Sequence, residues 1–424
     1  AVLEAVSHFA QNGKRVLAFA KKQINSTVAI DFNSVQNNLQ FIGLQAMIDP
    51  PREEVKTAIN KCHDAGITVK MITGDHQTTA AAIGADLNII SHQGSLSGEQ
   101  LERMSEAELT ESASSINIFA LVAPEHKLKL VSALQKKGEV VAMTGDGVND
   151  APALKKADIG VAMGITGTDV SRDAADIILT DDNFASIVAA VEEGRRVYDN
   201  LIKSLAFVLP TNFGEALILL AAVAFFPIID GVPLLPMSPI QILWINLVAT
   251  VSLALPLAFE SKESDIMNRK PRKPREPLLN RFVIIRTVLV ALIITGTGIG
   301  LFLHVFTRET EAGTAGIIAT AKAQTMAVTS IVFLQIFYLL NCRSLQRSIF
   351  SIGIFSNKTI LPGILILIAL QTGFVHLPFM NTLFGSAPLD LYSWLESILF
   401  GAVVLPVITI EKAIRNALHK KIAN

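Results

Sequence analysis

Met143-Thr-Gly-Asp-Gly-Val-Asn-Asp-Ala-Pro-Ala-Leu-Lys-Lys-Ala-Asp158 is the most informative stretch of this sequence. It places two carboxylates, Asp146 and Asp150, four residues apart on a turn interrupted by glycine. The apolar run 139–143 leads directly into this turn and predicts a buried strand. Because α/β folds bind ligands at the carboxyl ends of their strands, the stretch predicts a site for a metal and a phosphate.

Strand-like and helix-like segments alternate ahead of this stretch. The strand-like segments are 39–47, 67–72 and 139–143, and the helix-like segments are 53–65, 78–85 and 126–136. This alternation is typical of a parallel sheet with helices on both faces, a Rossmann-like α/β fold. We expect this domain to cover residues 36–198, with residues 1–35 as the end of another domain. The polar segment 95–115 is expected to be helical and to cover an edge.

The composition separates the chain into a soluble and an apolar part. Of its 424 residues, 50% are hydrophobic, and a mean hydropathy of +0.46 is high for a soluble protein. Long apolar blocks begin near residue 200. The net charge of −1 predicts no nucleic-acid partner, and the two distant cysteines, Cys62 and Cys342, predict no disulfide. The sequence starts without an initiator methionine or a signal peptide, so we expect it to be part of a larger protein.

Six apolar segments in residues 199–424 are expected to form an all-α membrane domain, since about 20 residues span a bilayer. They are 201–226, 240–259, 282–305, 325–340, 360–375 and 391–410. Lys and Arg concentrate in the loops after the second and fourth segments and in the C-terminal tail. Because basic loops stay in the cytoplasm, we expect a multi-pass membrane protein whose soluble domain and C-terminus are cytoplasmic.

Three loops of the soluble part are expected to meet at the carboxyl edge of the sheet. They contain Thr73-Gly74-Asp75, Lys127, and Asp146 with Asn149 and Asp150. Together they provide a hydroxyl for a phosphoryl oxygen, a lysine to offset developing charge, and carboxylates to bind and orient Mg²⁺. The combination predicts phosphoryl transfer.

The sequence is identified as resembling a known family on these motifs. Met71-Ile-Thr-Gly-Asp-His76, Pro124-Glu-His-Lys127 and Thr144-Gly-Asp-Gly-Val-Asn-Asp-Ala-Pro152 resemble the haloacid-dehalogenase-type phosphorylation domain of P-type ATPases. Asp49-Pro-Pro-Arg52 and Asp181-Asp-Asn-Phe184 match the same family. The resemblance extends over essentially the whole chain and is closest to the type-II branch that includes calcium pumps.

The resemblance implies ATP and Mg²⁺ as cofactors and assigns roles to several residues. It implies that Thr73 and Lys127 contact the phosphoryl group, that Asp146 binds Mg²⁺, and that Asn149 supports that metal site. Asp150 is expected at the same Mg²⁺ site from its carboxylate and its position in the motif. The residues expected to contact the nucleotide or its phosphate are Arg15, Arg52, Thr73, Gly74, Asp75, Lys127 and Asn149. For Arg15, a solvated surface charge is an equally good interpretation.

Two departures from the family pattern limit this resemblance. The phosphorylated aspartate belongs to an Asp-Lys-Thr-Gly motif that this sequence lacks, and without a nucleophile no aspartyl-phosphate forms. The family also has an arginine where Leu121 stands, so one nucleotide contact is in doubt. We therefore expect the C-terminal half of a pump, inactive alone, whose missing partner supplies the actuator domain, the first four transmembrane helices and the phosphorylated aspartate.

Polar side chains within the apolar segments predict a cation site. Asn212 and Glu215 share one helix face, and Asn246 and Thr250 share another. With Gln335 they would form an oxygen-lined site in the bilayer. For Thr250 and Gln335, hydrogen bonds between helices are an equally good explanation.

The sequence leaves the identity of the transported cation open. Calcium pumps carry an aspartate in place of Thr250 and often a glutamate in place of Gln335. The lower charge here favours either one divalent ion per cycle or a monovalent ion such as Na⁺, K⁺ or H⁺. A third interpretation is a non-catalytic regulatory membrane protein with a degenerate phosphatase-like domain, which the presence of Lys127, Asp146 and Asn149 disfavours.

Overall fold

The computed structural model describes most of the chain, and the chain divides into two compact units. The described residues are 2–23, 36–48, 50–89, 91, 93–229, 232–274, 276–345, 353 and 356–423. One unit comprises Ala1–Glu193 with Ser264–Arg275, and the other Gly194–Glu263 with Glu276–Asn424. Asp49 of the predicted Asp-Pro-Pro-Arg motif lies outside the described residues, as does the side chain of Thr250.

The first unit contains two sheets of three parallel strands each. In one sheet the strand order is β3 (Met71–Ile72), β5 (Ile118–Ala120) and β4 (Ser95–Ser97). In the other it is β6 (Ala142–Gly145), β7 (Ile159–Met163) and β8 (Ile177–Leu179). The strands β3 and β6 each lie at an edge of their own sheet.

Helices alternate with these strands along the chain. They are α3 (Glu53–Asp64), α4 (Gln77–Asp86), α5 (Gly98–Arg103), α6 (Glu106–Ser115), α7 (Pro124–Lys136), α8 (Ala151–Lys156) and α9 (Asp169–Ala174). Their apolar faces bury the strands so completely that Phe119, Ala120 and Ala162 are inaccessible to solvent. The expected alternation of helices with parallel strands is therefore present.

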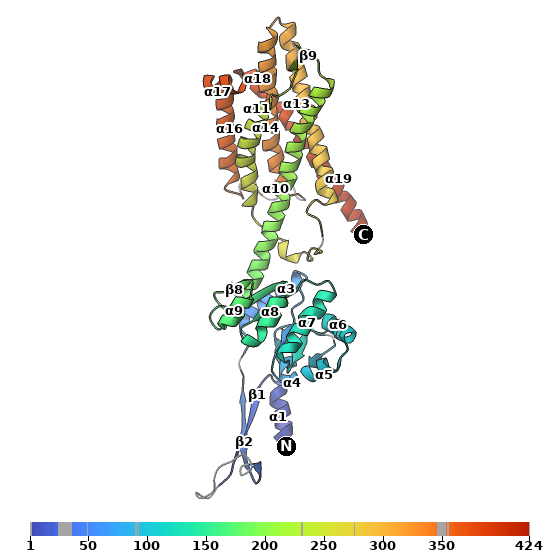
Figure 1. Ribbon diagram of the computed structural model, residues 1–424, viewed down its shortest axis with the longest axis vertical. Helices are drawn as coiled ribbons and strands as arrows, with labels where there is room; N and C mark the ends of the chain where they lie inside the picture. The colour runs from blue at the N-terminus through green and yellow to red at the C-terminus, as the bar shows by residue number, and fades with distance from the viewer. Residues whose placement is uncertain are drawn as a thin grey trace. The chain divides into compact units, whose positions relative to one another are not determined.

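The segment expected to be the first strand of the parallel sheet belongs elsewhere. It forms β2 (Gln40–Met47), which pairs antiparallel with β1 (Arg15–Lys21) after α1 (Val2–Gln11). Figure 1 shows these two strands as a long ribbon of their own. The sequence pattern identified the strand correctly, but alternation cannot reveal that its partner is an earlier segment.

The polar segment 95–115 also differs from the expected helix. It starts with β4, a strand of only three residues, and continues as α5 and α6. Both helices begin with a capping box, from Ser97 to Gln100 and from Ser105 to Glu108. Three-residue strands are too short to have a detectable period, so β4 and β5 escaped the sequence analysis.

The second unit is helical. Its elements include α10 (Phe184–Phe225), α11 (Pro239–Ala249), the π-helical turn Thr250–Ala254, α12 (Leu255–Ala258), α13 (Arg281–Glu311), α14 (Gly316–Cys342), α16 (Ile360–His376), α17 (Pro378–Phe384), α18 (Leu391–Ala402) and α19 (Val404–Ala423). The first ten residues of α10 belong to the other unit, and the rest of this single helix of 42 residues contains all but the last residue of the expected first span, 201–226.

Five helices in the described part of the chain are long and apolar enough to cross a membrane. The expected count of six is reached only if α16 and α17, which meet at 81°, form one span. The fourth expected span, 325–340, lies in α14, which packs against α13 and α18 and is largely buried (Figure 1). Its polar groups are therefore explained by a central position within the helical unit.

Candidate functional site

The loop that follows β6 is closed by one buried carboxylate. Asp150 lies in a 3₁₀ turn and is 5% exposed. Its Oδ2 accepts hydrogen bonds from the amides of Asp146 and Gly147, each at 3.2 Å. A Cβ at position 145 would come within 2.5 Å of the Asp150 Cβ, so Gly145 is required for this close approach.

Lys127 completes the surroundings of Asp150. Its Nζ lies 2.6 Å from Oδ1 of Asp150, so both oxygens of that carboxylate have partners. The Asp146 side chain is exposed, and its carboxylate makes no hydrogen bond or ion pair with the described residues. The two aspartates therefore differ in availability: Asp150 holds the loop and Lys127, whereas the Asp146 carboxylate is free to bind a cation.

A second loop fixes the backbone of Asp146. Its carbonyl accepts hydrogen bonds from the Thr168 amide at 2.8 Å and from Ser171 Oγ at 3.0 Å. Thr168 also caps α9 by accepting a bond from the amide of Ser171. The sequence analysis missed both residues, although a threonine is a common N-cap residue at the start of a helix.

Thr73 and Asp75 form a small closed turn after β3. Thr73 Oγ1 donates to Asp75 Oδ2 at 2.9 Å, and the Asp75 amide donates to Thr73 Oγ1 at 3.0 Å. Backbone bonds tie this turn to the loop after β5, since the amide of Val122 donates to the carbonyl of Thr73, and that of Leu121 to the carbonyl of Asp75. That loop leads directly into α7, which carries Lys127.

Leu121, where the family has an arginine, lies in a turn with an unusual backbone conformation. Leu121 adopts a left-handed conformation with φ of 52° and is 50% exposed. A Cβ at position 98 would lie 2.2 Å from the carbonyl oxygen of Leu121, so Gly98 allows the two segments to approach each other. A side chain at position 121 therefore projects from a strained turn beside the predicted phosphate loops.

Asp182, from the Asp-Asp-Asn-Phe motif, organises the loop after β7. Its carboxylate accepts hydrogen bonds from the amides of Ile165, Thr166 and Gly164 at 3.0, 2.7 and 2.7 Å. These amides, that of Ile165 first, lower the pKa of Asp182 to about 2. The loop that precedes Thr168 is thus held by an ionised carboxylate at neutral pH.

The two predicted nucleotide arginines occupy different places in the first unit. Arg15 is exposed on β1. Arg52 stands at the N-terminus of α3 and donates a long bond of 3.4 Å to the carbonyl of Asp182. Asn149 is exposed beside Asp150. Within the described residues, no bond joins either arginine to the Asp146 loop.

Three of the five predicted membrane-site residues meet inside the helical unit. Gln335 of α14 donates from Nε2 to Oε1 of Glu215 on α10 at 3.0 Å, and the Asn246 side chain of α11 is also within interaction range of Glu215. Glu215 and Gln335 are only 1% and 2% exposed. Oε2 of Glu215 and Oε1 of Gln335 are buried without a hydrogen-bond partner in the described part of the chain. Two unpaired oxygens therefore lie together in an apolar interior.

The remaining two predicted residues are placed differently. Asn212 is exposed, although it lies on α10 only three residues from Glu215. Thr250 starts the π-helical turn after Asn246. Gly363 of α16 packs so closely on this turn that a Cβ there would lie 2.2 Å from the Ser252 carbonyl oxygen. An irregular backbone thus lies four residues from Asn246, as is frequent at functional sites.

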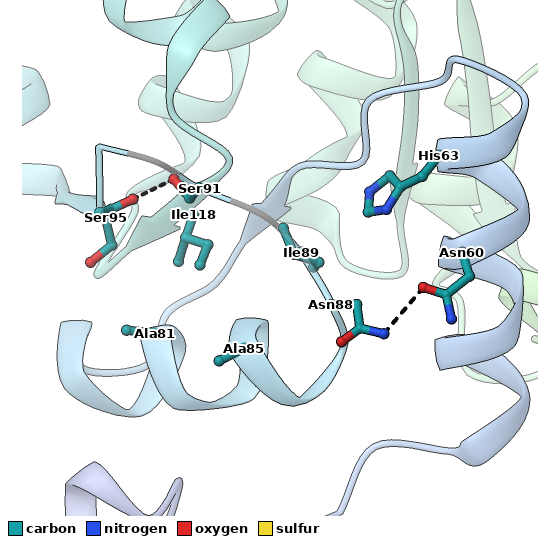
Figure 2. A pocket seen from close by; sticks show the side chains of 10 residues that line it. Asn60, His63, Ala81, Ala85, Asn88, Ile89, Ser91, Ser95 and Ile118 are labelled. Carbon is teal, nitrogen blue, oxygen red and sulfur yellow. Dashed lines mark hydrogen bonds between the residues drawn. The ribbon is translucent and has the colours of Figure 1, made fainter.

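A hollow in the first unit shares no residue with these sites. It has a volume of about 540 Å³ and is lined by Asn60, His63, Ala81, Ala85, Asn88, Ile89, Ser91, Gly94, Ser95 and Ile118 (Figure 2). A hydrogen bond of 3.2 Å joins Asn88 to Asn60 at its rim. No predicted site residue lines it.

Comparisons with known proteins cover both units. Residues 2–158 match the family model of haloacid dehalogenase-like hydrolases, and residues 234–414 match that of the C-terminus of cation-transporting ATPases. The chain is 46% identical over 413 residues to the cation-transporting ATPase pma1 of Synechocystis sp., which covers 95% of this chain and 44% of the relative. It is 39% identical over 397 residues to a calcium-transporting ATPase of Bacillus subtilis, covering 93% of this chain and 43% of the relative. The chain thus spans less than half the length of the curated relatives it matches.

Proposed function

Because this chain belongs to the P-type cation-transporting ATPases and corresponds to their C-terminal portion, we propose that it acts within an ATP-driven pump that moves a cation through an aspartyl-phosphate intermediate. The observation that carries this proposal is the division of labour after β6. Asp150 and Lys127 hold a loop that leaves the Asp146 carboxylate exposed. That is the arrangement a metal-assisted phosphoryl transfer requires.

The phosphorylated aspartate would be supplied by a strand from the missing N-terminal part. The edges of β3 and β6 support this, since neither strand has a second neighbour among the described residues. The amides of Met71 and Thr73 donate to the carbonyls of Asn117 and Phe119, in or next to β5. The backbone groups of β3 that alternate with these amides therefore face the open edge, where another strand could pair with them. A parallel strand between β3 and β6 would complete one Rossmann-like sheet and end between Thr73 and Asp146. We assign residues 36–198 to this phosphorylation domain and 1–35 to the end of the nucleotide-binding domain.

Each residue of the site then has a chemical role. Thr73 would donate a hydrogen bond to a phosphoryl oxygen, with Gly74 and Asp75 shaping its turn, and Lys127 would offset charge on the transferred group. Asp146 is suited to Mg²⁺ because its carboxylate is a hard, accessible oxygen ligand, and Mg²⁺ would neutralise the phosphoryl oxygens. Asn149 would support that ligand. Arg15 and Arg52 remain proposed nucleotide contacts.

The transported cation would bind near Glu215. The side-chain oxygens of Glu215 and Gln335 are buried together beside the half-buried Asn246. Oε2 of Glu215 and Oε1 of Gln335 lack the hydrogen bonds that buried polar atoms normally make. One carboxylate suits either one divalent ion or a monovalent ion better than two divalent ions. Asn212 and Thr250 would contribute further oxygens to this cation site in the complete pump, where the proposed first four transmembrane helices would pack against α10.

We further propose six spans, with the bent pair of α16 and α17 as one of them, and a cytoplasmic location for the soluble domain and C-terminus. The basic loops after the second and fourth spans support this orientation. The α10 helix would carry changes at the phosphorylation site into the first span, because its 42 residues are continuous.

The test uses the full-length protein in lipid vesicles. ATP hydrolysis is measured against Ca²⁺, Mn²⁺, Mg²⁺, Na⁺ and K⁺ for the natural protein, Glu215→Gln and a control, Thr372→Val, whose hydroxyl bonds only to its own helix. If a cation stimulates ATP hydrolysis, and Glu215→Gln weakens this stimulation whereas Thr372→Val does not, the result supports the pump. An absence of ATP hydrolysis with every cation would favour the non-catalytic regulatory protein with a degenerate domain.

A further inference from the structure

The α10 helix has one backbone carbonyl that the helix itself cannot satisfy. Pro210 lies inside α10 and has no N–H, so the carbonyl of Ala206, four residues earlier, loses its regular helical donor. Ala206 is fully buried. In an apolar interior, an unsatisfied carbonyl is costly, so a partner from elsewhere is expected.

Tyr338 of α14 provides that partner. Its hydroxyl donates to the Ala206 carbonyl at 2.6 Å. The Tyr338 side chain is fully buried, and its ring stacks on Phe207 with centroids 6.0 Å apart. The guanidinium of Arg286 lies 6.0 Å from the centre of the same ring. Tyr338 is therefore held in one place, and its only polar group replaces the N–H that Pro210 lacks.

The same helix, α14, contacts α10 on the other side of the proline. Gln335, one turn before Tyr338, donates to Glu215, five residues after Pro210. Thus α14 contacts α10 at Ala206 and at Glu215, with Pro210 between the two contacts. A helix is weakest where its hydrogen-bond ladder is interrupted.

A third helix contacts the same stretch of α10. The Thr295 hydroxyl of α13 donates to the carbonyl of Ala291 on its own helix at 2.8 Å and also lies 3.2 Å from the carbonyl oxygen of Gly214, so its proton is shared between the two. A Cβ at position 214 would lie 2.7 Å from Ile294, so glycine is required for this approach. The stretch that carries Glu215 is therefore positioned by bonds from outside the helix.

We propose that Tyr338 is a positioning residue for the cation site: by taking the place of the missing N–H of Pro210, it sets the course of α10 and holds the Glu215 carboxylate against Gln335. This inference rests on the proposed role of Glu215 in cation binding. It predicts that the Tyr338 hydroxyl matters only while position 210 is a proline.

A double-mutant cycle in the full-length protein tests this dependence. The variants are Tyr338→Phe, Pro210→Ala and their combination, with Tyr392→Phe, an exposed tyrosine, as the control. In vesicles, the cation concentration for half-maximal ATP hydrolysis is measured separately from the maximal rate. We expect Tyr338→Phe to raise that concentration about three- to tenfold, because it leaves a buried carbonyl unsatisfied. In the Pro210→Ala background the same change should have less than about a twofold effect, since an alanine at that position restores the N–H.

Each outcome decides a different point. An equal shift in both backgrounds, or none in either, overturns the inference, provided that Glu215→Gln shifts cation dependence. If Glu215→Gln has no effect, the proposed cation site fails. The thermal unfolding midpoints of the natural protein, the two single variants and the double variant still test the bond, and additive changes in midpoint overturn it. Should Pro210→Ala not accumulate, Pro210→Gly restores the same N–H.

Discussion

Lys127 Nζ and Asp150 Oδ1 lie 2.6 Å apart, and this contact joins the helix after β5 to the loop after β6. Both side chains are mostly buried, at 21% and 7% exposure. The carboxylate that receives Lys127 also receives two loop amides. The lysine thus positions the loop as well as offering its charge to a phosphoryl group.

Replacing Lys127 should therefore affect stability as well as chemistry. Lys127→Ala leaves a buried charge on Asp150 short of one partner, at a cost of about 1–3 kcal/mol. We expect a lower thermal unfolding midpoint and loss of phosphoenzyme in the full-length protein. Lys129→Ala, on the same helix but paired with exposed Glu102, is the control and should change neither. An unchanged midpoint for Lys127→Ala would show that the pair does not stabilise the loop.

Asp146→Asn should abolish Mg²⁺-dependent phosphorylation while leaving the fold intact. Its carboxylate has no partner in the described chain, so the amide removes a metal ligand without breaking an internal bond. We expect the rate of phosphoenzyme formation to fall about 10²-fold or more. Asp150→Asn is the comparison, because it should lower the unfolding temperature too. Normal phosphoenzyme levels in Asp146→Asn would refute the metal role.

Glu215→Gln should weaken cation activation and spare nucleotide binding. Loss of the one carboxylate among the buried oxygens removes a charged ligand worth about 1.5–3 kcal/mol, or tenfold and more in apparent affinity, at about 1.4 kcal/mol per factor of ten. Half-maximal cation concentrations in vesicles give the affinity, and binding of a fluorescent nucleotide provides the control. An unchanged cation dependence would remove Glu215 from the site.

The loop after β7 should show a specific acid sensitivity. The Asp182 pKa is about 2 in the folded chain, below its usual value near 4. A lowered pKa stabilises the folded state above the unfolded pKa, and this stabilisation is lost as the pH falls from about 4 to 2. Asp182→Asn should therefore lower the unfolding midpoint at pH 6, and the difference from the natural protein should shrink towards pH 2. Asp64→Asn, at an exposed position, should show no such convergence.

Features with long motifs at strand ends were predictable. The segments around Thr73, Lys127 and Asp146 combine polar chemistry with an apolar strand, and the structure places each at the end of a parallel strand or the start of the following helix. The partner of β2 was not predictable, because pairing with β1 joins segments separated by many residues. Thr168 and Ser171 were missed because they hold the backbone, not the side chain, of Asp146.

The membrane residues show the same limit. Helical spacing put Asn212 and Glu215 on one face, yet one is exposed and the other buried. Spacing describes one helix, whereas burial depends on its neighbours. The bond from Tyr338 to Ala206 is invisible for a related reason: a backbone acceptor leaves no mark in the sequence beyond the proline four residues later.

Among the described residues, β3 and β6 each have one neighbouring strand, and their other edges affect how the chain behaves when it is produced by itself. Exposed strand edges are templates for pairing with other chains, and Val140 and Ile159 beside β6 add exposed apolar surface. When the chain is produced by itself and its membrane helices are covered by detergent, it should still self-associate through these edges as its concentration rises. A soluble peptide with the sequence of the missing strand would suppress that aggregation by occupying the same edges.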